Sequence, residues 1–101
     1  MALLEQSAGQ GLAHAMYALG NGHAVRKDFE QAKVWYIKGA EAGLAKSMFS
    51  LGNVHDMGVG MAAPDYPEAA VWYRRAGEAG SGAGASNLAG MYAVGRGGPG
   101  R

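Results

Sequence analysis

One segment of this chain is written twice, and that duplication limits the available folds more than any other feature. The first copy, VWYIKGAEAGLAKSMFSLG, starts at Val34, and the second, VWYRRAGEAGSGAGASNLAG, starts at Val71. The copies are offset by 37 residues, so that Trp35 corresponds to Trp72. A period of roughly 20 to 50 residues is typical of stacked arrays in which each unit covers the apolar face of the next. The repeat therefore predicts a solenoid.

Each unit reads as a pair of helices, which makes the predicted fold all-α. The first helix of the pair is carried by AHAMYALG from Ala13, AKSMFSLG from Ala45 and GAGASNLAGMY from Gly82. The second helix is carried by DFEQAKVWYIKGAEAG from Asp28 and DYPEAAVWYRRAGEAG from Asp65. Apolar residues recur at spacings of three and four along both second helices, which predicts one buried stripe on each. The expected architecture is an α-α superhelix, a right-handed solenoid of antiparallel helix pairs.

N-capping residues mark the starts of the second helices. The carboxylates of Asp28 and Asp65 can accept hydrogen bonds from the free N–H groups of a first turn. Gln31 and Glu68 follow three residues later, which completes a capping-box pattern at both starts. The residues predicted to form the structural core are Trp35, Tyr36, Trp72, Tyr73, Leu19, Leu51 and Leu88.

The first unit is shorter than the others. Only 32 residues separate Leu19 from Leu51, and GNGHAV stands where the next unit has GNVHDMGVGM, so the end of the helix and its loop are expected to be truncated, with His23 in the loop. LLEQSAGQG from Leu3 occupies the positions of half a second helix, which gives about 2.5 repeats. The expected solenoid covers residues 1–95, and the Gly-rich residues 96–101 are predicted to be disordered. Uncovered apolar surface is expected at the ends, on Met1, Leu3, Leu4 and Val94.

Composition argues against several classes of function. Nine Lys and Arg residues face eight Asp and Glu residues without a basic run, so no nucleic-acid partner is expected. No apolar run is long enough to span a bilayer, so no membrane partner is expected. The absence of cysteine removes disulfides, thiolate metal sites and cysteine nucleophiles. The start MALLEQ lacks the order of a signal peptide, so a cytoplasmic location is the expectation.

The chemistry-bearing residues form no catalytic or metal-binding pattern. His14, His23 and His55 include no i, i+4 pair, and Asp56 points about 100° away from His55 on a helix. The serines lie in no nucleophile-elbow context, and GRGGPG lacks the lysine and the following helix of a phosphate loop. We therefore expect no metal, no cofactor and no catalytic residue, and an enzyme ranks last among the candidate functions.

The two units resemble the Sel-one-like repeat (SLR) family, a relative of the tetratricopeptide repeats. The first helices match its pattern at Ala13, Ala15, Met16, Leu19, Gly20, Ala45, Met48, Leu51, Gly52, Leu88 and Tyr92. The loop matches at Gly58, Gly60 and Asp65, and the second helices match at Trp35, Tyr36, Ala40, Gly43, Trp72, Tyr73, Ala76 and Gly80. His55, Gly39 and Gly77 depart from the pattern. The resemblance implies a non-catalytic adaptor that binds a protein or peptide on a concave face. Secreted bacterial members with a disulfide in each repeat differ from this cysteine-free chain.

The candidate partner-binding surface is the outward face of the first helices. It comprises His14, Tyr17, Asn21, Lys46, Phe49, Ser50, Asn53, Ser86 and Asn87. The repeat does not require an aromatic residue at Tyr17 or Phe49, and aromatic anchors ringed by polar residues are typical of binding surfaces. The alternative is that both rings pack on a neighbouring helix. The predicted function is a protein or peptide interaction module, and the alternative is self-assembly into a homo-oligomer or a longer solenoid through the exposed terminal helices.

Overall fold

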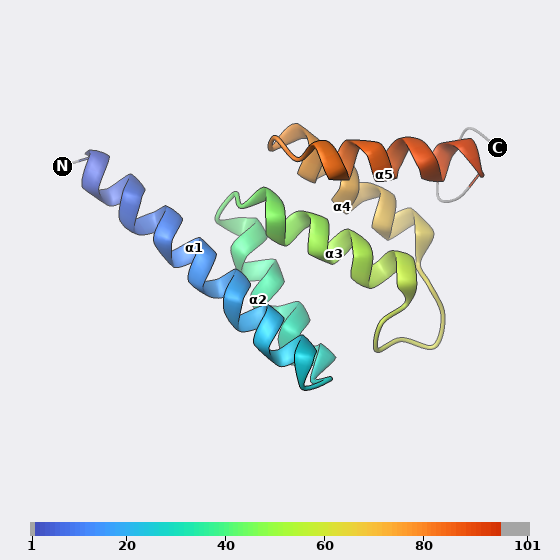
Figure 1. Cartoon of the computed structure of the whole chain (residues 1–101), viewed down its shortest axis with the longest axis horizontal. Coiled ribbons are helices and arrows are strands. Elements are labelled where there is room, and N and C mark those ends of the chain that lie inside the picture. Colours follow the sequence, from blue (N-terminus) through green and yellow to red (C-terminus); the bar gives the residue numbers. More distant parts are fainter. Residues whose placement is uncertain (1, 96–101) are drawn as a thin grey trace.

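The fold is a single array of antiparallel helices. The computed structural model describes residues 2–95, with side chains from residue 11 onward, and the predicted tail 96–101 and the side chains of Leu3 and Leu4 lie outside this part, as does Met1. The helices are α1 (Ala2–Val25), α2 (Phe29–Glu41), α3 (Ala45–Met57), α4 (Tyr66–Glu78) and α5 (Gly82–Ala93), and the described residues contain no strand (Figure 1). Each helix packs on the next in an elongated body of 49 × 29 × 15 Å. The predicted all-α solenoid is confirmed.

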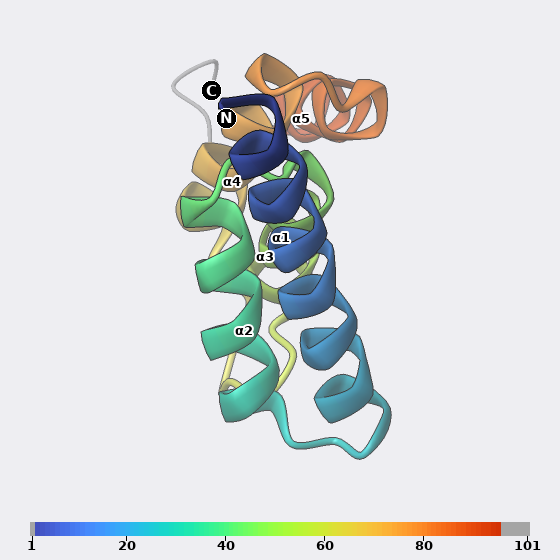
Figure 2. The same ribbon diagram turned by 90° about the vertical axis from the view of Figure 1, so that its left-hand side faces the viewer.

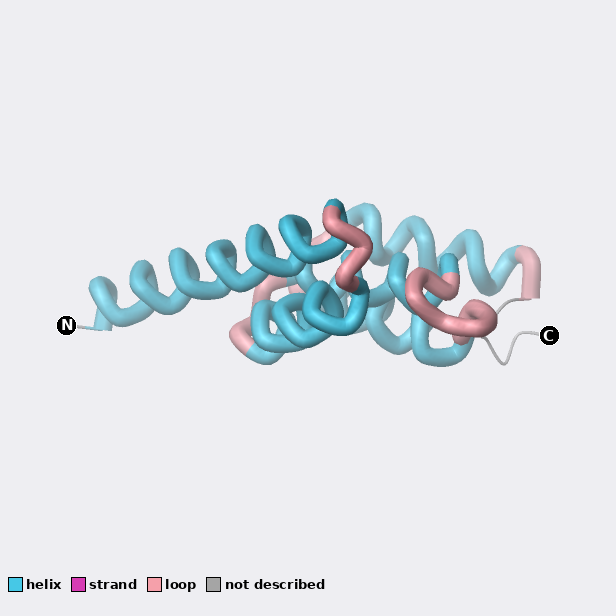
Figure 3. The backbone as a smooth tube through the Cα atoms, turned by 90° about the horizontal axis from the view of Figure 1, so that it is seen from below, coloured by secondary structure: helices cyan, strands magenta, loops and turns pink. Residues whose placement is uncertain are grey.

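The connections alternate between the two ends of the helix pairs. Residues 26–28 join α1 to α2, and residues 58–65 join α3 to α4. These two loops therefore lie on the same side of the array (Figure 3). Figure 2 shows α1 and α2 side by side along their whole common length, joined at the bottom by the shorter loop. Because every first helix of a unit runs in the same direction, α1, α3 and α5 contribute equivalent faces to one side of the array.

The prediction for the first unit was wrong in two respects. Residues 2–25 form one continuous helix, so the segment from Leu3 does not turn back as half of a second helix, and His23 is helical. No proline interrupts this stretch, and an isolated glycine weakens a helix by about 1 kcal/mol without ending it. The helix ends where Lys27 takes a left-handed conformation, with φ of 64°. The missing five residues therefore all come from the loop, which has three residues here and eight in the next unit.

The predicted aspartate caps are present, but the reciprocal half of each capping box is not. The carboxylate of Asp28 accepts from the backbone N–H of Gln31 at 3.4 Å, and that of Asp65 accepts from Glu68 at 3.2 Å. The backbone N–H of Asp28 donates to the carbonyl of His23, so it is not available to Gln31. Asp65 makes the equivalent bond to His55, which anchors the start of each second helix to the preceding helix.

The core lies between the helices, and three of the seven residues predicted for it are buried. Tyr36, Leu51 and Tyr73 are buried, whereas Leu88 is half-buried. Leu19 is 46% exposed and does not belong to the core, because α1 packs mainly on α2 among the described helices and this position is left uncovered.

The two tryptophans are half-buried, and Trp72 packs against the buried core. Each is flanked by a cation from the next helical turn: Lys38 lies 4.4 Å from the centre of the Trp35 ring, and Arg75 lies 4.7 Å from that of Trp72. Such cation–π contacts contribute about 0.5 to 1 kcal/mol at exposed sites. The repeat thus reproduces the surface contact as well as the buried one.

Close packing of a tyrosine ring on a glycine joins the two helices of each unit. A Cβ atom on Gly20 would lie 2.6 Å from the ring of Tyr36, and one on Gly52 would lie 2.4 Å from the ring of Tyr73. Both rings are buried, so neither can move aside without opening the core. By contrast, a Cβ atom on Gly22 of α1 would meet no atom within 4 Å.

Gly52→Ala is expected to destabilise the fold, because the added methyl group overlaps the Tyr73 ring and overpacking costs about 1 to 3 kcal/mol. Gly22→Ala is the matched control and should raise the free energy of unfolding by about 0.5 to 1 kcal/mol through helix propensity alone. Urea denaturation of both variants measures the difference. A Gly52→Ala variant as stable as the Gly22→Ala variant would show that the ring contact does not set the helix spacing.

His55 occupies a buried position at the end of α3. It is 7% exposed, and its Nδ1 atom has no hydrogen-bond partner among the described residues. Burial lowers the pKa of His55, and the charge of Lys33 lowers it further, while Glu68 and Asp65 act in the opposite direction. The folded protein therefore binds a proton on His55 less readily than the unfolded chain does.

Stability should fall on acidification through this residue. Because the pKa of His55 is lower in the folded state than its ordinary value of 6.5, its contribution is complete above that value and is lost as the pH falls toward the folded pKa. We expect the urea midpoint of the parent protein to decrease as the pH falls from about 7.5 to about 5.5. The urea midpoint of His55→Phe should decrease less over the same interval. An equal decrease in both proteins would assign the pH dependence to other groups.

Candidate functional site

The predicted binding residues gather along α1, α3 and α5, and three of them meet in one wide groove. Tyr17 from α1 and Lys46 and Phe49 from α3 line it together. The groove has a volume of 650 Å³ and is mainly apolar, and the rest of its lining comes from Gly43, Leu44, Ala45, Ala79, Gly80, Ser81, Gly82 and Ala83. Among the described residues of the lining, Lys46 alone is charged. The groove thus joins three helices that are far apart in sequence.

The two candidate anchors, Tyr17 and Phe49, also pack on the core tyrosines. The ring centres of Tyr17 and Tyr36 are 6.1 Å apart, and those of Phe49 and Tyr73 are 5.8 Å apart, both with planes inclined by 43°. These distances are in the range preferred by aromatic pairs. Both anchor rings are half-buried, so one side packs while the other faces the groove. Packing is therefore present, and binding stays a prediction.

The predicted asparagines are held by the hydroxyl groups of the same core tyrosines. Tyr36 donates to Oδ1 of Asn21 at 2.5 Å, and Tyr73 donates to Oδ1 of Asn53 at 2.6 Å. Because the carbonyl oxygens are engaged, the Nδ2 amide groups are the natural donors to a bound backbone. Each asparagine side chain is thereby oriented before any partner arrives.

Burial keeps both tyrosine hydroxyl groups protonated. It raises the pKa of Tyr73 to about 12, against a hydrogen bond with Asn87, and the carboxylate of Asp56 adds to the increase. It also raises the pKa of Tyr36, with a further contribution from Tyr17 and an opposing hydrogen bond with Ser50. Each hydroxyl thus interacts with two successive first helices, since Ser50 and Asn87 are equivalent residues of α3 and α5.

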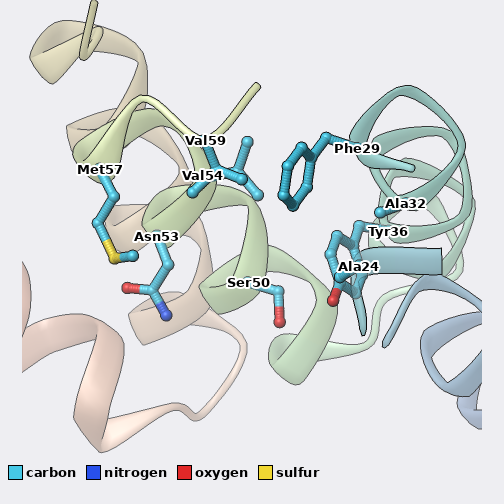
Figure 4. Close-up of a pocket in the computed structure, with 9 residues that line it drawn as sticks. All are labelled: Ala24, Phe29, Ala32, Tyr36, Ser50, Asn53, Val54, Met57 and Val59. Atoms are coloured by element: carbon cyan, nitrogen blue, oxygen red, sulfur yellow. The ribbon is translucent and has the colours of Figure 1, made fainter. Parts of the chain in front are cut away.

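A separate hollow, which we call the first hollow, lies between α1, α2 and the second half of α3. It has a volume of 270 Å³ and is lined by Ala24, Phe29, Ala32, Tyr36, Ser50, Asn53, Val54, Met57 and Val59. Phe29 faces Val54 and Val59 across it, with Ser50 below (Figure 4). The hollow is thus apolar, with a few polar groups at its edge. Of the predicted binding residues, Ser50 and Asn53 belong to it.

The remaining predicted residues lie at the margins. His14 is exposed and lines a small hollow with Ala13, Ala42, Gly43 and Leu44, next to the wide groove. Ser86 is exposed on α5, and Asn87 is half-buried beside Asp56. The apolar residues of the first hollow, Phe29, Val54, Met57 and Val59, were not predicted. The repeat gave no signal for them, because a conserved spacing identifies the core and says little about gaps between units.

Two observations bear on other kinds of site. No group of three or more His, Cys, Asp or Glu residues in the described part of the chain is arranged to hold a metal ion. None of the described helices combines the length and apolar character needed to cross a membrane.

Comparison with known proteins places the array in a family. The Sel1 repeat model matches residues 10–44 and 45–81, which begin within α1 and at the start of α3. A protective antigen of uropathogenic Escherichia coli with an SLR fold superposes with a TM-score of 0.75 at 36% identity, over 89% of this chain and 20% of that one. A Sel1 repeat protein from Oxalobacter formigenes gives a TM-score of 0.71 at 29% identity, over 95% of this chain and 38% of that one.

This chain thus spans less than half the length of both neighbours, and no curated relative matches it. The match to the family model covers both complete units, and the resemblance inferred from the repeat is confirmed. The chain belongs to the Sel1 repeat family.

Proposed function

We propose that this chain is a non-catalytic binding module for an extended segment of a partner protein, which docks across α1, α3 and α5. Sel1 repeats as a class are protein-interaction modules. The observation that carries the proposal for this chain is the convergence of Tyr17, Phe49 and Lys46 in one apolar groove. Half-buried aromatic rings with a polar surround supply large contact area at a small cost in side-chain entropy.

The polar groups of the same face suit an extended backbone. The side chains of Asn21 and Asn53 recur at equivalent positions of α1 and α3 and are oriented by tyrosine hydroxyl groups. A peptide in extended conformation presents backbone carbonyl groups along its length, and the amide groups of two oriented asparagines can donate to them. Preorganised donors reduce the entropy lost on binding.

Tyr17→Ala and Phe49→Ala are expected to weaken binding of peptides selected from a library of short random sequences by about tenfold or more, since buried aromatic anchors contribute about 2 kcal/mol or more. Val34→Ala on α2 is the matched control, because Val34 is 42% exposed and lies outside the groove. Fluorescence polarisation with labelled peptides measures the affinities. If the groove variants bind as the control does, the proposed docking face is wrong.

Self-association is a second candidate because α1 carries an uncovered apolar stripe. Leu12 is 61% exposed and Leu19 is 46% exposed, and their spacing of seven residues puts them on one helix face with Ala15. In an array, that face would be covered by a preceding second helix. A second copy can cover it in the same way.

The double variant Leu12→Glu with Leu19→Glu should abolish any concentration-dependent increase in mass seen by light scattering, because charge on the stripe opposes burial. Val25→Glu, at a position that is 84% exposed at the end of α1, serves as the control. A parent chain that remains monomeric at all concentrations would remove the support for this candidate.

A further inference from the structure

The first hollow has an equivalent one unit further along the array, which we call the second hollow. It lies between α3 and α5, has a volume of 340 Å³ and is lined by Asp56, Asn87, Gly90, Met91 and Val94. Each of these residues corresponds through the repeat to a lining residue of the first hollow, in order Ala24, Ser50, Asn53, Val54 and Met57. The hollows are therefore a product of the repeat, with one at each junction between units.

The two hollows differ in charge although they share a position. Ala24 in the first is replaced by Asp56 in the second, and Ser50 is replaced by Asn87. The described residues of α5 include no charged side chain, so this helix offers no cation to Asp56. The first hollow is accordingly apolar, and the second carries a carboxylate.

The carboxylate of Asp56 is only partly satisfied. Its Oδ2 atom lies 3.2 Å from the hydroxyl of Tyr73, whose single proton it shares with the closer Oδ1 atom of Asn53. The Oδ1 atom of Asp56 is buried and has no hydrogen-bond partner among the described residues. A buried acceptor without a partner is unfavourable, and more so when it belongs to a charged group. The second hollow is thus a place where an incoming cationic donor gains more than a neutral group would.

We propose that the two hollows bind two side chains of one docked segment, with an apolar residue in the first hollow and a lysine or arginine in the second. This inference rests on the proposed function and adds the chemistry of the partner. Successive side chains of an extended chain point to opposite faces, so the two side chains that enter the hollows are separated by an even number of positions in the partner.

The position of Lys46 supports the same assignment. It precedes Asp56 by ten residues on α3, so the two charges are separated by about 15 Å along the helix. A cation of the partner placed in the second hollow therefore avoids Lys46 while it pairs with Asp56. A cation in the wide groove would face Lys46 with no acidic residue in that lining.

The test pairs one change in the protein with one change in the ligand. Peptides are first selected on the full chain from a random library, and the basic residue of a selected peptide is replaced by norleucine. We expect the replacement to weaken binding to the parent by about fivefold or more, and to have no effect on binding to Asp56→Asn, which keeps the shape and the bond to Tyr73. Binding to the parent should also weaken with added salt, and binding to Asp56→Asn should not. Glu78→Gln on α4 is the control, an exposed acid outside both hollows.

The apolar position is tested in the same way. Ala24→Leu fills the first hollow from α1, and it should remove the benefit of the apolar peptide residue over serine. Ala93→Leu makes the same change at the equivalent, exposed position of α5, outside both hollows, and should leave that benefit intact. Thermal unfolding of each variant verifies that it is folded.

The outcomes separate the two proposals. In one outcome, the selected peptides need Tyr17 and Phe49 but require their basic residue as strongly on Asp56→Asn as on the parent. That result would overturn the assignment of the hollows and leave the proposed docking face intact. Peptides indifferent to Tyr17 and Phe49 would overturn both.

The chain has cations of its own beyond α5, in Arg96 and Arg101. Replacing both by Gln should change peptide affinity by less than about twofold. A rise of about tenfold would show that the chain itself supplies the cation to the second hollow, and would overturn the assignment to a partner.

Discussion

The packing of a tyrosine ring against a helical glycine sets the spacing of the two helices in each unit. Gly20 receives Tyr36 and Gly52 receives Tyr73, at distances that leave no room for a methyl group. In α5 the equivalent residue is Ala89, which is exposed. The glycine is thus retained where a ring needs it. Because the ring lies so close to the helix, its hydroxyl reaches the asparagine that follows the glycine. The same tyrosine therefore joins the two helices and orients a side chain on the surface.

The side chains on that surface are held in place by contacts with the core. The ring of Tyr36 supports Tyr17, and its hydroxyl fixes Asn21, while Tyr73 does the same for Phe49 and Asn53. A side chain fixed by the core loses little conformational freedom when a ligand arrives. The aromatic and amide groups of the docking face are therefore positioned by residues whose first role is stability, and a substitution that loosens the ring contact should disturb the face as well.

Sequence alone accounts for most of the fold, because the signals it used are local and repeated. The aspartate caps, the buried stripe and the offset of 37 residues all report on contacts within a unit or between copies of it. The continuous α1 was not predicted, because the residues from Leu3 were assigned to half of a second helix by analogy with the later units. Leu19 was misplaced for the same reason. The hollows were not predicted either, because a gap depends on three helices at once, and periodicity within one helix does not describe it.

The division between fixed and varying positions explains how such an array can acquire specificity without altering its fold. Tyrosine and glycine recur in the two complete units and carry the helix spacing, whereas the hollows are lined at equivalent positions by different residues, with alanine in one unit and Asp56 in the next. A change at those positions alters the charge of a hollow at small cost to the core, since the ring contacts lie deeper. Under the proposed function, a partner would be recognised through its contacts with successive hollows, so that the order of side chains in the partner matches the order of units in the chain.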